Sequence, residues 1–195
     1  MKLAFLLSDK NRILALSGLL FMLWLSLLGC AASRPTAAND GSTTVYIVRH
    51  AEKDPTPGLA DPVLTPAGEQ RALALRETLG KEPIAAIFTT NTIRTRTTAA
   101  PLAQKLNLTP QVYDARQQSA LVERIKTEFA GKKVLVVGHS NTILETAEAL
   151  GATRPVPAVA DNEFSYLLEV KLTATGAAAA TVRQYGAAAV PAASK

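Results

Sequence analysis

Two short apolar runs, each followed by a histidine, constrain the fold of this chain more than any other feature. Residues 45–48 (Val-Tyr-Ile-Val) precede Arg49 and His50, and residues 134–137 (Val-Leu-Val-Val) come just before His139. Such runs, bounded by polar residues, are typical of buried strands in a parallel sheet. Ligands bind beyond the carboxyl ends of these strands. The two imidazoles, the only ones in the chain, are therefore predicted to emerge at one edge of one sheet.

Strand-like runs alternate with helical segments along the rest of the chain. This alternation predicts an α/β fold, a three-layer α/β/α sandwich whose mostly parallel central sheet is joined by late antiparallel strands. A length of 195 residues and a hydrophobic content of 48% suit one such domain. The expected elements are strands at 44–49, 84–88, 111–113, 133–137, 164–172 and 180–185. Helices are expected from 66 to about 79, after residue 91 to 106, from 117 to 130, and after residue 140 or 141 to 150.

Helix starts are marked by capping residues. Thr65 is expected to cap a helix whose first residue is Pro66, where the missing N–H costs nothing. Asn91 is expected to cap the next long helix, and Ser140 or Asn141 the helix that follows the second histidine. The last two helix starts lie at strand ends, so their free N–H groups favour a bound anion there.

Composition excludes several other kinds of site. The net charge of +5 is mild, and no basic run supports nucleic-acid binding. A single cysteine, Cys30, excludes an intrachain disulfide and a cysteine-based metal site. Two histidines without HExxH spacing or a carboxylate cluster make a poor set of metal ligands, so neither a metal nor another cofactor is expected.

The amino terminus resembles that of a bacterial lipoprotein. Residues 13–29 are almost wholly apolar, and Leu-Leu-Gly-Cys at 27–30 resembles a lipobox, in which the cysteine is lipidated after cleavage. We expect a signal peptide at 1–29, lipid on Cys30 and a flexible tether over 30–42. An uncleaved apolar anchor is the open alternative. Both place the protein on the extracytoplasmic side of a membrane.

The remaining boundaries follow from composition. The functional domain is expected to span residues 43–185. The alanine-rich residues 186–195 are expected to form a disordered tail. Ala31, directly after the cysteine, resembles lipoproteins sent to the outer membrane, where the protein would face the periplasm if the source has two membranes.

The side chains at the sheet edge suit phosphoryl chemistry. Guanidinium groups match phosphate oxygens, so Arg49 and Arg94, which follows a third strand, suggest a phosphate ligand. His50 could attack phosphorus, and His139 could donate to a phosphoryl oxygen. Residues expected to bind substrate are Arg49, Arg94, His139, Ser140 and Asn141.

Four motifs then carry a family resemblance. Val-Arg-His-Ala-Glu at 48–52 resembles the RHG or RHA/E signature of the histidine phosphatase superfamily, also called the phosphoglycerate mutase-like family. Residues 64–72 resemble its LTxxGxxQA helix start, residues 94–99 its RAxQTA segment, and residues 138–141 its second-histidine motif. The matches occur in the family's order and span roughly residues 44–172 of the chain.

The resemblance implies a phosphoglycerate mutase-like fold and a metal-independent phosphatase. It also implies that His50 becomes phosphohistidine in a pocket formed with Arg49, Arg94 and His139. The general acid does not follow from it, because the acid-phosphatase position after the second histidine is Ser140.

Two carboxylates are candidates for that acid. Asp114 follows the short strand at 111–113, and Glu52 lies two residues after the nucleophile. Without a strong acid, substrates with good leaving groups are favoured, such as phosphohistidine, acyl phosphates or pyrophosphate-type compounds.

The leading prediction is a membrane-tethered phosphatase acting on a phosphorylated small molecule or phosphoprotein. The alternative is a binding lipoprotein that keeps the fold and holds a phosphate or phosphoprotein without turnover. A phosphomutase is disfavoured because the stretches between motifs are too short for an enclosing pocket. The oligomeric state is not predicted.

Overall fold

A computed structural model describes residues 41–188 of the chain. The predicted signal peptide, Cys30 and nearly all of the tether lie outside the described residues, as does most of the predicted tail. Within the described range, no helix combines the length and apolar character that a membrane crossing requires.

Strands and helices alternate as the pattern predicts, and the chain ends in two consecutive strands. In chain order the elements are β1 (Thr43–Arg49), α2 (Pro66–Leu79), β2 (Ile84–Thr89), α3 (Ile93–Leu106), β3 (Gln111–Val112), α4 (Gln118–Glu128), β4 (Lys133–Gly138), α5 (Ile143–Ala149), β5 (Tyr166–Leu172) and β6 (Ala178–Gln184).

The strands form one six-stranded sheet in the order β3-β2-β4-β1-β5-β6. β1, β2, β3 and β4 pair in parallel, while β5 pairs antiparallel with both β1 and β6. This confirms the predicted α/β architecture, with a mostly parallel sheet and late antiparallel strands. Because β4 lies between β1 and β2, the carboxyl ends of all three strands meet at one edge.

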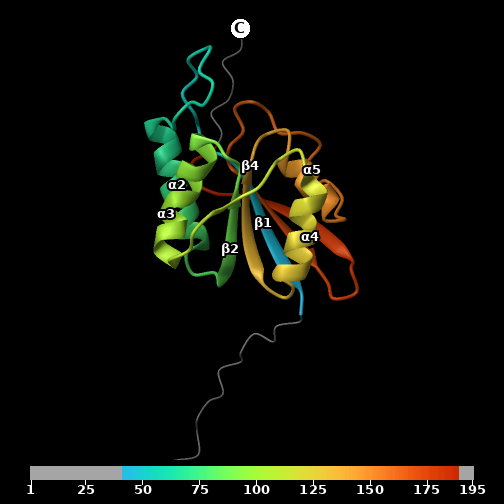
Figure 1. Ribbon diagram of the computed structural model, residues 1–195. Coiled ribbons are helices and arrows are strands. Elements are labelled where there is room, and N and C mark those ends of the chain that lie inside the picture. The colour runs from blue at the N-terminus through green and yellow to red at the C-terminus, as the bar shows by residue number, and fades with distance from the viewer. Residues whose placement is uncertain (1–40, 189–195) are drawn as a thin grey trace, which may run out of the picture. The chain divides into compact units, whose positions relative to one another are not determined.

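Helices α2 and α3 cover one face of the sheet, and α4 and α5 cover the other (Figure 1). Successive side chains of a strand point to opposite faces. In β1, Tyr46 and Val48 pack into the apolar cluster with α2 and α3, while Val45 and Ile47 pack into the cluster with α4 and α5. All four are buried, so the run that looked uniformly apolar in the sequence fills two separate cores.

Helix α2 begins as the sequence predicts. Thr65 accepts a hydrogen bond from the backbone N–H of Gly68, and Pro66 occupies the first helical position. Gly68 also lets α2 approach the loop after β1, because a Cβ there would lie 2.2 Å from the carbonyl oxygen of Glu52. The helix is thereby held directly against the segment that carries His50.

Two of the predicted caps are wrong. Thr92, not Asn91, caps α3 and accepts a hydrogen bond from the backbone N–H of Thr95. The Asn91 side chain instead accepts a hydrogen bond from Arg96.

The start of α5 also differs from the prediction. Thr142 precedes the helix, and neither Ser140 nor Asn141 caps it. The Thr142 hydroxyl bonds backward to the N–H of His139 and so stabilises the turn rather than the helix.

Candidate phosphate site at the sheet edge

Pairing of β1 with β4 brings the two histidines together. In the parallel register Arg49 lies opposite Gly138, so each histidine follows one member of a matched pair. The backbone N–H of His50 donates to the carbonyl of Gly138 (2.9 Å), which extends the pairing by one residue. The His50 and His139 ring centroids are 5.4 Å apart, in an edge-on arrangement.

His50 has its tautomer set by the backbone. Its Nδ1 lies 2.8 Å from the carbonyl oxygen of Ala51. Since a carbonyl only accepts, Nδ1 carries the proton and Nε2 keeps its lone pair. Burial lowers the pKa of His50 to about 3, assisted by the charges of Arg49 and Arg94 and by His139, against the opposing effect of the Ala51 hydrogen bond. The ring is therefore neutral near pH 7.

Arg49 is buried, and one nitrogen of its guanidinium donates hydrogen bonds to the backbone. Its Nη1 donates to the carbonyls of Ala160, Asp161 and Glu163 at 2.9–3.0 Å. The ring of Phe164 lies 4.1 Å from Cζ, within cation–π range. The Nε of Arg49 is buried and has no hydrogen-bond partner. The loop before β5 thus orients this side chain and leaves one buried donor unused.

Arg94, on the first turn of α3, likewise has one paired and one unpaired guanidinium nitrogen. Its Nη1 contacts Asp61 Oδ1 at 3.2 Å, while its Nε is buried without a partner. The Asp61 carboxylate also accepts from the backbone N–H of Ile93 (2.9 and 3.0 Å). It so ties the proline-rich loop between β1 and α2, residues 54–63, to the start of α3. Sequence reasoning missed Asp61 because no motif distinguishes it within that loop.

Two buried guanidinium donors without partners indicate an anion site. An unsatisfied buried N–H costs free energy, and an oxyanion accepting from it would recover that cost. The charges of Arg49 and Arg94 both act on His50 and on His139, which places the four side chains in one electrostatic neighbourhood.

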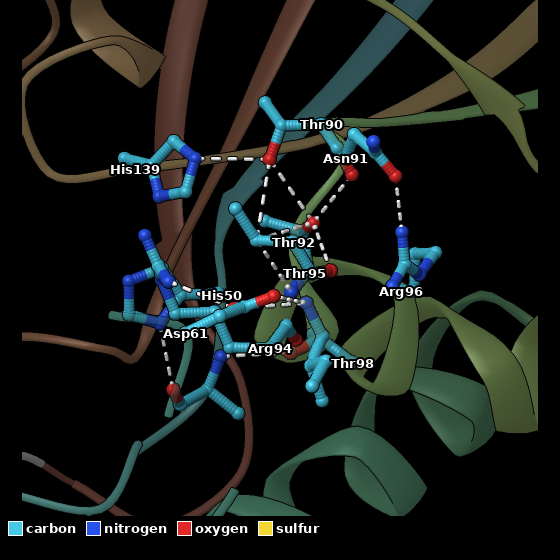
Figure 2. Close-up of polar contacts among 12 residues, drawn as sticks. His50, Asp61, Thr90, Asn91, Thr92, Arg94, Thr95, Arg96, Thr98 and His139 are labelled. Carbon is cyan, nitrogen blue, oxygen red and sulfur yellow. Dashed lines mark hydrogen bonds and ion pairs between the residues drawn. The ribbon is translucent and has the colours of Figure 1, made fainter. Parts of the chain in front are cut away.

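His139 is neutral near pH 7 for the same reasons as His50. Burial lowers its pKa to about 4, assisted by Arg94 and Arg49 and opposed by Asp61. Its Nε2 lies 2.9 Å from the hydroxyl oxygen of Thr90, and Figure 2 shows this contact beside His50 and Arg94. The sequence analysis did not single out Thr90.

The side chain of Thr98 joins the segment after His50 to helix α3. The hydroxyl of Thr98 donates to the carbonyl of Arg94 (2.7 Å) and accepts from the backbone N–H of Ala51 (2.9 Å). The segment after His50 and the helix that carries Arg94 therefore share one fixed hydrogen bond. The dense threonines of residues 89–98 were the only sequence signal for this contact.

Glu52 forms an ion pair with Arg71 in which the arginine is buried and the carboxylate is partly exposed. Arg71 of α2 donates to both of its carboxylate oxygens at 2.7–3.0 Å and also to the carbonyl of Tyr185 (2.9 Å). Burial raises the pKa of Glu52, but the hydrogen bonds and charge of Arg71 outweigh it, so the pKa lies below its ordinary value. An ionised Glu52 has no proton to donate, and its contacts indicate a structural role.

Asp114 is held in a similar way on the surface. Its carboxylate accepts hydrogen bonds from Arg116 and Gln117. The Arg116 hydrogen bonds lower the pKa of Asp114, which keeps this carboxylate ionised as well. Neither carboxylate predicted as the proton donor is therefore protonated near pH 7.

Ser140 and Asn141 border a pocket of about 240 Å³ directly after His139. Leu144, Pro157 and Val159 contribute apolar surface to it, and its lining includes neither histidine and neither Arg49 nor Arg94. Within residues 41–188 no three His, Cys, Asp or Glu side chains gather closely enough to hold a metal ion.

Neutral imidazoles and unpaired guanidinium donors lie together at the carboxyl ends of parallel strands, which makes this edge of the α/β fold a candidate phosphate site. A family model of the histidine phosphatase superfamily (branch 1) matches residues 45–118, which contain His50 and Arg94. The match covers less than half of the chain and agrees with the resemblance that the motifs predicted, to a family of histidine-type phosphatases.

Known proteins resemble parts of this chain in sequence or in structure. The PE-PGRS family protein PE_PGRS11 of Mycobacterium tuberculosis is 42% identical over 84 residues, which are 38% of this chain and 14% of that protein. A mycobacterial glucosyl-3-phosphoglycerate phosphatase superposes with a TM-score of 0.60 at 15% identity, over 75% of this chain and 100% of its own.

A protein of Nakamurella multipartitia assigned as the phosphohistidine phosphatase SixA gives a TM-score of 0.55 at 22% identity, over 77% of this chain and 98% of its own. These two structural likenesses show the same fold.

Replacing Arg71 by Met should lower the free energy of unfolding by about 1–3 kcal/mol, because it leaves the partly buried Glu52 carboxylate without its partner. Chemical denaturation would measure the loss. The matched control, Arg76→Met, removes an exposed pair with Glu77 and should change nothing measurable.

The Arg71 effect should also depend on pH. A carboxylate whose pKa is lowered on folding contributes fully above its ordinary value of 4.5, and the contribution is lost as the pH falls through the folded value. The two proteins should therefore converge in stability in acid. Equal stability at pH 7 would contradict the structural role of Glu52.

Both histidines should titrate far below 6.5 in the folded protein, His50 near pH 3 and His139 near pH 4. NMR of the imidazole C–H resonances would follow them, with the urea-unfolded chain as the control that titrates normally. Because the unfolded chain binds these protons first, stability should decline as the pH falls below 6.5. Folded-state titration near 6.5 would contradict the buried, cation-flanked site.

Proposed function

We propose that the protein is a metal-independent phosphatase that works through a phosphohistidine on His50. The observation that carries the proposal is the free lone pair on His50 Nε2, set by the Ala51 hydrogen bond, beside the unpaired Nε donors of Arg49 and Arg94. A nucleophile and its oxyanion donors are thus present before substrate arrives, which is the arrangement that accelerates phosphoryl transfer.

The reaction has two displacements. In the first, Nε2 of His50 forms a bond to phosphorus while the bond to the leaving group breaks and takes its electron pair away. The guanidinium groups of Arg49 and Arg94, with His139, stabilise the three equatorial oxygens. In the second, water attacks phosphorus, the N–P bond breaks, and inorganic phosphate leaves with His50 restored.

The first displacement is demanding for a poor leaving group. Both candidate proton donors, Glu52 and Asp114, are held ionised by arginines. We propose that the natural substrates have leaving groups that need little protonation: phosphohistidine, acyl phosphates or pyrophosphate-type compounds. The Nakamurella multipartitia neighbour, assigned as a phosphohistidine phosphatase, is consistent with this class.

We also propose that a lipid on Cys30 anchors the enzyme outside the cytoplasm, facing the periplasm if the source has an outer membrane. The support is the apolar run at 13–29 with its terminal Leu-Leu-Gly-Cys. The substrate would then be a phosphorylated small molecule or phosphoprotein in that compartment.

Incubation with a labelled phosphodonor and rapid quenching should trap an acid-labile, alkali-stable phosphoprotein. The label should disappear in His50→Gln, which removes the nucleophile, and should form more slowly but still appear in His139→Gln. Label that persists without His50 would place the intermediate elsewhere. Phosphate binding with no turnover of any phosphoester or phosphoramidate would favour the non-catalytic binding protein instead.

Hydrolysis should depend steeply on the leaving group. Alkyl phosphates are expected to react about 10²- to 10⁴-fold more slowly than aryl or acyl phosphates, the range that a general acid contributes. Values of kcat/KM across a leaving-group series measure this, with Asp114→Asn as the matched variant that should leave the dependence unchanged. A flat dependence, or a selective loss on alkyl phosphates in that variant, would show that an acid operates after all.

Cys30→Ser should abolish incorporation of labelled fatty acid and release the protein from the membrane fraction. Ala31→Ser, one residue away, is the control and should change neither. A Cys30→Ser protein that still sediments with membranes would support the uncleaved apolar anchor.

A further inference from the structure

The hydroxyl of Thr90 is a hydrogen-bond partner of the His139 side chain. Its oxygen lies 2.9 Å from Nε2 of the imidazole, and both residues follow parallel strands, β2 and β4. In Figure 2 the ring turns this nitrogen toward Thr90 and its opposite edge toward His50. Thr90 is buried, so water does not replace its hydroxyl easily.

Neighbouring threonines leave the Thr90 hydroxyl able to donate or accept. The hydroxyl of Thr95 donates to the carbonyl of Thr90 (2.9 Å), so its oxygen remains an acceptor 3.1 Å from the Thr90 oxygen. The Thr90 proton can therefore point to His139 or to Thr95. The Thr90 hydroxyl donates to His139 when Nε2 carries no proton, and it donates to Thr95 when Nε2 is protonated.

We propose that Thr90 is a positioning residue that keeps Nδ1 of His139 protonated and directed at the phosphoryl group. With neutral His139, Thr90 donates to Nε2 and the single ring proton stays on Nδ1. With charged His139, Nε2–H donates to Thr90, and Nδ1 is protonated again. This inference rests on the proposed function, because it assigns Nδ1–H as a donor to the phosphoryl oxygens.

The charges around His139 make the proton's position matter. Arg94 and Arg49 disfavour the imidazolium, Asp61 favours it, and His50 lies beside it as a neutral ring. Burial and the arginines prevail, so near pH 7 His139 has one ring proton to place. A proton on Nε2 would turn the lone pair of Nδ1 toward the phosphoryl oxygens and weaken their binding.

Thr90→Val keeps the shape of the side chain and removes the hydroxyl. We expect kcat/KM to fall about 10- to 100-fold, which corresponds to the loss of one hydrogen bond from Nδ1–H of His139 to the charged phosphoryl oxygens. Thr90→Ser restores the hydroxyl and should recover activity to within about threefold. Thr89→Val is the matched control: the neighbouring threonine is equally buried and its hydroxyl has no partner, so its loss should leave activity unchanged.

The decisive readout is the His139 tautomer, measured by ¹⁵N NMR of the imidazole nitrogens in the 195-residue chain near pH 7. Only two histidines contribute, and His139→Gln assigns the signals. Wild type and Thr90→Ser should carry the proton on Nδ1, while Thr90→Val should shift it to Nε2. A merely structural role would lower stability without moving this proton.

An Nε2–H tautomer in the wild type, or an Nδ1–H tautomer retained in Thr90→Val, would overturn the inference. The tautomer is read without substrate, so it separates this inference from the proposed function. If the wild type has Nδ1–H and Thr90→Val does not, yet no substrate is turned over, then Thr90 controls the tautomer and the catalytic proposal alone has failed. Titration with inorganic phosphate then shows whether binding weakens in Thr90→Val, and equal affinity would also overturn the inference.

Discussion

The parallel pairing of β1 with β4 is the constraint on which the site depends. Its register sets Arg49 opposite Gly138, and the backbone N–H of His50 donates to the carbonyl of Gly138. A shift by one residue would turn each side chain of β1 to the other face of the sheet. Because both faces are buried under different helices, such a shift would disrupt two cores at once, so the separation of the imidazoles is as well determined as the core itself.

Burial gives these side chains their chemistry. Desolvation is the largest cause of the lowered pKa values of His50 and His139, and the neighbouring guanidiniums act in the same direction. Two cations can be kept close to two bases because the bases remain neutral. The same desolvation makes the unpaired Nε groups of Arg49 and Arg94 strong sites for an oxyanion. The nucleophile and the anion site that we propose therefore have one physical origin.

The carboxylates near the candidate site support the scaffold. Glu52 joins the loop after His50 to α2 and, through Arg71, to the end of β6. Asp61 joins the proline-rich loop to the start of α3 and to Arg94. These acidic groups hold the loops that carry the basic groups, which is why the substrates we propose are those that need least help from a proton donor.

The sequence by itself determined the order of strands and helices and the edge at which His50 and His139 emerge, because both follow from local apolar patterns and from the rule that parallel strands end together. It indicated a family resemblance through short motifs, most of which lie at those strand ends. Only the tertiary structure decided which side chains pair across long separations: Asp61 with Arg94, Thr90 with His139, Arg71 with Glu52. It also decided that Thr92 rather than Asn91 caps α3, since several neighbouring polar residues could cap equally well. Such contacts depend on distances between segments remote in the chain, and local patterns carry no information about those distances.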